Sequence, residues 1–377
     1  MKNNAIGLYL HIPFCRSKCP YCDFYSLAFD EDLADRYTAA LIRTMSAHPF
    51  GELTADSLYL GGGTPSLLGA NRLTALLDAA ARSFSLDAES EVTIEANPES
   101  CDFALLDDLC RAGFNRLSIG AQSGNLNELA ALGRAHTADQ AFEAIQAGAK
   151  AGFANISADL MLAIPGQDSQ SLSASIRGLA DLPTQHISAY LLKLEPGTPM
   201  ASAHTQGALT LPSEDAAADL YLQAVSELCG AGFIQYEISN FARPGHESRH
   251  NLKYWRCQPY LGLGPAAHSC LNGRFSFPAD LDAFLEAETP FSLIARDPPT
   301  SAPEEALLLA LRLSEGFDTA RLNEWGIDPA PLLKKARALT AHGLCQVKGD
   351  RISLTPQGFL LSNTVTILLL DTIKKEQ

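Results

Sequence analysis

The sequence has little that would carry it into a membrane or onto nucleic acid. None of its apolar runs approaches the roughly 20 residues that a membrane-spanning helix needs. Its first residues, MKNN, lead into a short apolar run without the hydrophobic region of a signal peptide. Lys and Arg number 28 against 43 Asp and Glu, and the resulting net charge of −15 opposes binding to phosphate backbones. We therefore expect a cytoplasmic protein with no nucleic-acid partner and no transmembrane segment, and a peripheral membrane association stays open.

Paired cysteine spacing is also missing from most of the chain. Six of the nine cysteines are scattered, which argues against a disulfide framework and favours a reducing compartment. We expect most of these six to be core thiols. They are Cys101, Cys110, Cys229, Cys257, Cys270 and Cys345.

The other three cysteines form one compact motif. Cys15, Cys19 and Cys22 stand in a C-x3-C-x2-C spacing directly after an apolar run, and Pro13 and Pro20 constrain the loop that carries them. A structural zinc site needs four ligands, and an ordinary [4Fe–4S] cluster takes four Cys. Three thiolates therefore favour an iron–sulfur cube with one iron left open over three thiols that are close by chance.

At these residues, from Tyr9 to Phe24, the sequence resembles the cluster loop of radical S-adenosylmethionine (SAM) proteins. More narrowly, it is similar to the branch that contains the oxygen-independent coproporphyrinogen III dehydrogenases and the HemW heme chaperones. The resemblance implies a [4Fe–4S] cluster whose fourth iron is chelated by the amino acid end of SAM. It assigns Cys15, Cys19 and Cys22 to the cluster and Tyr9, Tyr21 and Phe24 to cofactor contacts.

The first half of the chain alternates short apolar runs, predicted as strands, with amphipathic helices. In the first helix Leu33, Tyr37, Leu41 and Met45 recur on one face. Such a series forces parallel strands with right-handed crossovers, and six units rather than eight predict a partial (β/α)6 barrel. Functional groups are then expected at the carboxyl ends of the strands. The predicted strands are 7–12, 57–60, 92–95, 116–120, 156–162 and 186–192, and the predicted helices are 31–46, 70–84, 102–112, 126–132, 138–151 and 170–182.

The second half breaks this pattern. Proline and glycine gather at 193–212, where we place the end of the barrel, and a helix follows at 213–231 with Ser213 as its N-cap. The order helix, helix, helix, strand, strand from 304 to 354 predicts a winged-helix-like domain, and the run 365–370 predicts a buried closing segment. The sequence thus predicts an α/β fold in three parts: a radical SAM partial barrel (1–200), an α+β extension (201–300) and the C-terminal winged-helix-like domain (301–377).

Polar residues follow several of the predicted strands. Gly61-Gly62-Gly63-Thr64-Pro65 comes after the second strand, where consecutive glycines let the backbone approach a ligand. It resembles the Gly-rich motif that holds the SAM amino group. A guanidinium such as that of Arg134 can bind a carboxylate at two points. The alternative for each residue is a satisfied polar group at a strand end. The resemblance assigns Gly62, Gly63, Thr64, Glu95, Gln122, Arg134 and Asp159 to the SAM site.

Two features separate a dehydrogenase from a chaperone. The dehydrogenases carry a further Cys two positions after the third motif Cys, and this position is Phe24 here. The hexad His250-Asn251-Leu252-Lys253-Tyr254-Trp255 matches the HNxxYW motif that the HemW branch associates with heme. A neutral imidazole is the usual heme ligand, so we expect His250 to contact heme, with His246 and His268 as nearby alternatives.

The resulting prediction is a heme chaperone with a SAM-chelated [4Fe–4S] cluster. The resemblance implies that it binds heme, passes it to acceptor hemoproteins such as respiratory cytochromes, and takes electrons from reduced flavodoxin or ferredoxin. Whether SAM is cleaved stays open. The alternatives are oxidative decarboxylation of coproporphyrinogen III propionates, radical chemistry on another substrate, and an inert structural cluster.

Overall fold

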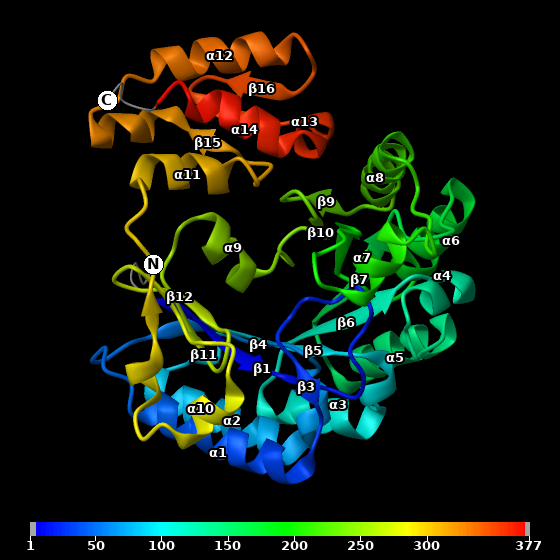
Figure 1. The fold of residues 1–377 in the computed structure, drawn as a ribbon, viewed down its shortest axis with the longest axis vertical. Helices are drawn as coiled ribbons and strands as arrows, with labels where there is room; N and C mark the ends of the chain where they lie inside the picture. The colour runs from blue at the N-terminus through cyan, green and yellow to red at the C-terminus, as the bar shows by residue number, and fades with distance from the viewer. Residues whose placement is uncertain (1–4, 374–377) are drawn as a thin grey trace.

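The computed structural model describes residues 5–373 and contains the predicted partial barrel (Figure 1). Six parallel strands lie side by side in chain order, and helices connect them on one side of the sheet. The strands are β1 (Ile6–Ile12), β4 (Ala55–Gly62), β5 (Glu91–Ala96), β6 (Arg116–Gln122), β7 (Asn155–Leu162) and β8 (His186–Leu191). The helices between them are α1 (Glu31–Ser46), α2 (Gly69–Phe84), α3 (Phe103–Ala112), α4 (Leu126–Ala131), α5 (Ala138–Ala151) and α6 (Ser169–Ala180), with 3-10 turns η1 (Pro65–Leu68) and η2 (Pro98–Ser100).

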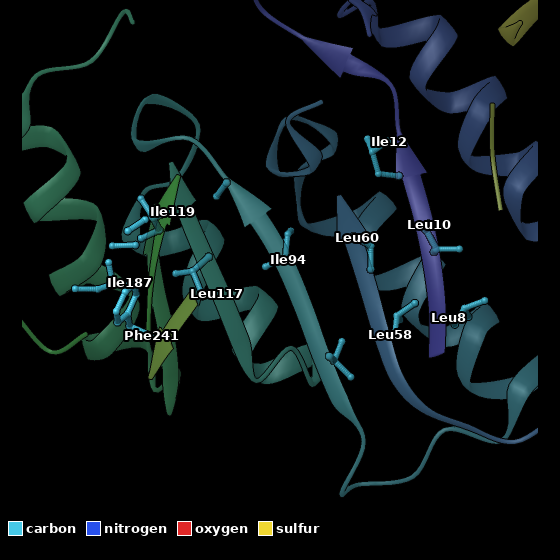
Figure 2. Close-up of a cluster of buried hydrophobic side chains, with 14 of the residues drawn as sticks. Leu8, Leu10, Ile12, Leu58, Leu60, Ile94, Leu117, Ile119, Ile187 and Phe241 are labelled. Atoms are coloured by element: carbon cyan, nitrogen blue, oxygen red, sulfur yellow. The ribbon is translucent and has the colours of Figure 1, made fainter. Parts of the chain in front are cut away.

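The two faces of this sheet differ in chemistry because side chains alternate along each strand. On the face towards α1, α2 and α3, every second residue is a fully buried aliphatic side chain, and Figure 2 shows this core. The intervening positions on the concave face are polar in the central strands. They include Tyr59, Glu95, Arg116, Asp159 and His186. The fold therefore uses one face for stability and leaves the other for chemistry.

Local signals set the helix ends. Asp30, Asp102, Thr137 and Asp168 each accept a hydrogen bond from a first-turn amide as N-caps. Gly113 ends α3 in the left-handed conformation. These caps explain why helix boundaries read from the sequence agree closely with the observed ones.

Residues after the barrel extend the same sheet at both edges. At the β1 edge, β11 (Tyr260–Leu263) pairs parallel with β1, and β12 (His268–Cys270), β13 (Arg274–Ser276) and β14 (Ala295–Arg296) follow antiparallel. At the β8 edge, β10 (Asn240–Ala242) and β9 (Ile234–Gln235) add antiparallel strands. The result is one 12-stranded sheet. The other elements of this region are α7 (Pro199–Thr205), α8 (Glu214–Gly230), α9 (Arg249–Trp255), α10 (Leu281–Glu286) and η3 (Pro290–Leu293).

Helix α9 lies across the sheet from α1 and α2, on the concave face (Figure 1). Its N-terminus is held by Glu91, whose carboxylate accepts from the amides of Arg249 and His250 at 2.9 and 2.8 Å. Lys253 pairs with Asp56 at 2.8 Å. Because Glu91 and Asp56 lie at the beginnings of β5 and β4, α9 covers the amino-terminal end of the concave face.

The C-terminal domain has the predicted order of elements. Its helices are α11 (Ala302–Ala310), the 3-10 helix η4 (Thr319–Trp325) and α12 (Ala330–Thr340), and its sheet contains β15 (Phe317–Asp318), β17 (Arg351–Leu354) and β16 (Cys345–Lys348). Helices α13 (Pro356–Leu360) and α14 (Ser362–Leu370) close the domain. The predicted closing segment is only half buried, because Val365 and Leu369 pack inside while Ile367 is 58% exposed. No helix within residues 5–373 is long and apolar enough to cross a membrane.

Candidate functional site

The three motif cysteines share one loop at the carboxyl end of β1. Strands β2 (Phe14–Cys15) and β3 (Leu27–Ala28) pair at its base, and the amide of Cys22 donates to the carbonyl of Cys19 at 3.1 Å within it. All three thiols are free and partly exposed. The loop thus presents three sulfurs at the edge where the barrel topology predicted function.

Hydrogen-bond donors surround these sulfurs. The Thr64 hydroxyl donates to Cys15 Sγ at 3.8 Å, and Arg134 Nη1 donates to Cys19 Sγ at 3.4 Å. Burial raises the pKa of the Cys22 thiol, and the backbone amide of Phe24 acts against that rise. Because iron is bound by thiolates, donors aimed at sulfur favour the form that a cluster needs.

The cysteine loop offers three thiols, the number that a [4Fe–4S] cluster with one open iron needs. Within residues 5–373, no three His, Cys, Asp or Glu side chains form a group that could hold a metal ion. A cubane cluster places each Cys on a different iron, so it requires thiols distributed around a loop rather than gathered at one point. Cys15, Cys19 and Cys22 are separate free thiols on one loop, and each can supply one such thiolate.

Asn97 links the predicted SAM residues to one another, although sequence reasoning did not single it out. Its amide donates to the Thr64 hydroxyl at 2.9 Å and accepts from Arg134 Nη2 at 2.5 Å. A Cβ added to Gly120 would meet Gln122, Asn97 and Arg134 within 3.2 Å, so these three side chains meet above that glycine. The signal in the sequence that could have identified Asn97 is its position two residues after Glu95, directly after the carboxyl end of β5.

Arg134 retains an unused donor in this cluster of polar groups. Its Nη2 donates to Asn97 and to the carbonyl of Gly120, but its buried Nε has no hydrogen-bond partner among the described residues. A buried guanidinium donor without an acceptor is costly. A carboxylate is the acceptor that satisfies it best.

The glycine run has a structural cause that the sequence did not reveal. A Cβ on Gly61 would press on Glu95 and Tyr59, one on Gly62 would lie 2.5 Å from the His11 ring, and one on Gly63 would lie 2.5 Å from the carbonyl oxygen of Phe14. Gly62 also has a φ of 113°. The run therefore packs tightly against β1, β5 and the base of the cysteine loop.

Glu95 and Asp159 are half-buried carboxyl groups on the concave face. Glu95 accepts from the Tyr59 hydroxyl at 2.7 Å and from the Gly62 amide at 3.1 Å. Burial raises the pKa of Glu95 to about 7 and that of Asp159 to about 6. Arg116, only 2% exposed, opposes both shifts, and its Nε and Nη1 have no hydrogen-bond partner among the described residues. Both carboxyl groups therefore have pKa values well above those of exposed carboxyl groups.

The remaining predicted cofactor residues occupy different surroundings. The Tyr9 hydroxyl bonds His11 Nδ1 at 3.0 Å, Tyr21 packs against Leu132, Met161, Ile164 and Met200, and Gln122 adopts a φ of 67° at the end of β6. Phe24 is 62% exposed, so its side chain faces solvent beside the cysteine loop.

His250 lies apart from this group, at the floor of the barrel. Its Nδ1 bonds Ser57 Oγ at 3.0 Å and its Nε2 bonds the Tyr254 hydroxyl at 2.7 Å. Its ring lies 5.3 Å from the ring of Tyr59, and burial lowers its pKa to about 3. In this conformation the imidazole is neutral and neither nitrogen is open, so its predicted heme contact stays a prediction.

Comparison with known proteins identifies two matching segments and full-length relatives. Residues 9–177 match the radical SAM superfamily, and residues 297–361 match the HemN C-terminal domain. The heme chaperone HemW of Mycobacterium tuberculosis is 36% identical over 98% of this chain and 96% of its own length. The heme chaperone HemW of Bacillus subtilis is 34% identical over 95% and 97%.

The fold has a close structural counterpart. Coproporphyrinogen III oxidase (HemN) from Escherichia coli, a radical SAM enzyme, superposes with a TM-score of 0.83 over 97% of this chain and 90% of that one. The identity is 22%, so this likeness concerns the fold alone. It agrees with the partial barrel and the appended C-terminal domain described above.

Proposed function

Because this chain belongs to the HemW family of the radical SAM superfamily, we propose that it binds heme and passes it to acceptor hemoproteins, such as respiratory cytochromes. The observation that carries the proposal is the similarity over 98% of the chain to a protein named heme chaperone HemW. The cysteine loop and the polar groups around it support the accompanying [4Fe–4S] cluster and SAM.

The residues of the site have roles that follow from their contacts. We propose that Cys15, Cys19 and Cys22 each hold one iron and that the free donor of Arg134 binds the SAM carboxylate. When bound and reduced, such a cluster supplies the electron that radical SAM proteins use to cleave SAM. The other proposed SAM contacts are Tyr9, Tyr21, Phe24, Gly62, Gly63, Thr64, Glu95, Gln122 and Asp159.

An electron donor would meet two exposed cations, and the exposed carboxylate of Asp23, on the cysteine loop. Arg16 and Lys18 are exposed on the cysteine loop of an otherwise acidic protein. Flavodoxins are acidic, so we propose that reduced flavodoxin, or a ferredoxin, docks at this loop through charge complementarity.

Heme transfer tests the proposed function directly. We expect the anaerobically reconstituted protein to bind heme with a defined stoichiometry and to give it up to an apo-hemoprotein, as measured by the absorbance of the acceptor. With reductant and SAM, we expect no steady conversion of coproporphyrinogen III. Steady formation of protoporphyrinogen would instead identify a dehydrogenase, and failure to bind heme would contradict the chaperone function.

SAM binding is expected to depend on pH through the carboxyl group of Glu95. SAM carries cationic groups and hydroxyl donors, both of which favour ionised carboxylates, whereas burial raises the pKa of Glu95 to about 7 in the free protein. Binding must then release the proton at low pH, so affinity should rise with pH, about tenfold from pH 6 to pH 8. Calorimetry over this range measures the effect. Glu95→Gln should bind SAM more weakly with a flatter profile, and a flat profile in the unmodified protein would contradict this role.

A further inference from the structure

Heme binding by an imidazole requires a histidine with an open ring nitrogen. All nine histidines lie within the described residues. On the concave face, His11, His186 and His250 use both nitrogens: His11 bonds Tyr9 and Tyr25, and His186 bonds Ser157 and Tyr236. None of these three can take iron without breaking one of these hydrogen bonds.

His268 differs from them in exposure and in position. It is the first residue of β12 and is exposed, whereas its neighbour Ser269 is buried and bonds the backbone of Gly262. Ser269 pairs with Phe275, whose ring packs on Phe50, on the helix-covered side of the sheet. Side chains alternate along a strand, so His268 points to the concave side.

The pairing of β12 with β11 indicates the same orientation for the His268 side chain. Cys270, two residues after His268, pairs with Tyr260, and the Tyr260 ring lies 4.5 Å from that of Tyr254 on the concave face. Because β11 runs parallel to β1 and β12 returns antiparallel, His268 lies at the carboxyl end of these strands. That is the end from which the cysteine loop departs.

The turn before His268 is held rigidly. Gly264 has a φ of 107° and leaves room for the Tyr37 hydroxyl, which donates to the His11 carbonyl. Ala266 has a left-handed φ of 60°, which costs energy for a residue with a Cβ, and its amide donates to the Pro278 carbonyl at 3.0 Å. The surroundings thus impose a strained turn that fixes where β12 begins.

The concave face carries aromatic side chains that could contact a flat ring. The half-buried Tyr9 ring lies on this face, and Gly262, its neighbour in the β1–β11 register, has no side chain because the backbone of His268 occupies the space that a Cβ would need. Tyr190, at the carboxyl end of β8, is 40% exposed and points to the same face as Ser188, which bonds Asp159. Aromatic rings provide the apolar contact that a porphyrin needs.

We propose that His268 ligates the heme iron on the concave face, beside the SAM site, while His250 is a fixed part of the barrel floor. This inference rests on the proposed function, because it names the ligand of that heme. It assigns the HNxxYW helix a structural role: His250 supports Tyr59, which in turn bonds Glu95.

Heme titration of matched variants tests the assignment. His268→Ala should bind heme about tenfold more weakly and lose the imidazole signature in the absorbance and electron paramagnetic resonance spectra, and added imidazole should restore the signature. His268→Cys should convert the spectrum to that of a thiolate-ligated heme, an outcome that misfolding cannot imitate. The control is His204→Ala, which removes an exposed imidazole on α7 and should change nothing.

The outcomes distinguish a failure of the His268 assignment from a failure of the proposed function. Cluster content and SAM affinity of His268→Ala should equal those of the unmodified protein. His250→Ala should keep the imidazole signature but lose SAM affinity through Tyr59 and Glu95. If the unmodified protein binds heme and His268→Ala retains its signature, His268 is not the ligand. If the unmodified protein binds no heme, both the proposed function and this inference are wrong.

Discussion

Replacing any one of Cys15, Cys19 and Cys22 by Ala is expected to remove the iron–sulfur cluster. Each thiol holds a different iron in the proposed arrangement, and the loop between β2 and β3 supplies no substitute Cys or His. Iron and sulfide content after anaerobic reconstitution, together with the brown absorbance of the cluster, should fall close to zero in each variant. This is the largest effect that we expect from a single substitution.

The matched control removes a thiol that has no part in the loop. Cys229, near the end of α8, is an exposed free cysteine, so Cys229→Ala should reconstitute a full cluster. Circular dichroism of the loop variants should remain that of the folded protein, because the main hydrophobic core lies on the other face of the sheet. Full cluster content in all three loop variants would refute the site.

Loss of Arg134 is expected to produce the second largest effect, on SAM affinity. Its side chain contacts Asn97, Gly120 and Cys19 and still has one buried donor without a partner. Removing one partner of a buried charged hydrogen-bonded pair costs about 2 kcal/mol or more, so Arg134→Ala should weaken SAM binding roughly thirtyfold or more. Calorimetry on the reconstituted protein measures this.

Two further variants show whether geometry or charge matters. Arg134→Lys keeps the charge but loses the planar guanidinium, which positions Nε while its other nitrogens bond Asn97 and Gly120, so it should recover only part of the affinity. Arg111→Ala removes an exposed guanidinium that pairs with Asp107 on α3, and it should leave SAM binding unchanged. Unchanged SAM affinity in Arg134→Ala would exclude the proposed carboxylate contact.

The elements of the barrel could be predicted because their signals are local. The predicted bounds of α1 and α5 coincide with the observed ones, since apolar periodicity and the N-caps Asp30 and Thr137 lie within the segments themselves. Strand β7 differs from its prediction by one residue. The carboxyl-end rule for parallel barrels then placed the cysteine loop and Thr64 on the same edge before any distance was known.

Contacts between distant segments could not be predicted in this way. The pairing of Gly7 with Tyr260 adds β11 beside β1 at one edge of the barrel sheet, and no pattern within either segment predicts this contact. Sequence reasoning did not select Asn97, because its role is to form hydrogen bonds with both Thr64 and Arg134. Only the fold brings these three residues together.

The HNxxYW hexad illustrates the same limit at a single residue. Its residue types suit a heme contact, and sequence reasoning therefore assigned His250 to heme. The hydrogen bond to Ser57 spans 193 residues of chain, and the clamp by Glu91 spans 159. A motif shows which groups are present, whereas its burial depends on partners elsewhere in the sequence.

The central claim is that three thiolates hold an iron–sulfur cube whose fourth iron is reserved for SAM. Electron paramagnetic resonance of the reduced, reconstituted protein, recorded with and without SAM, tests it most directly. We predict the signal of a reduced [4Fe–4S] cluster that changes its g values when SAM is added. A signal that SAM leaves unaltered, or a loop that carries zinc in place of iron, would contradict the account.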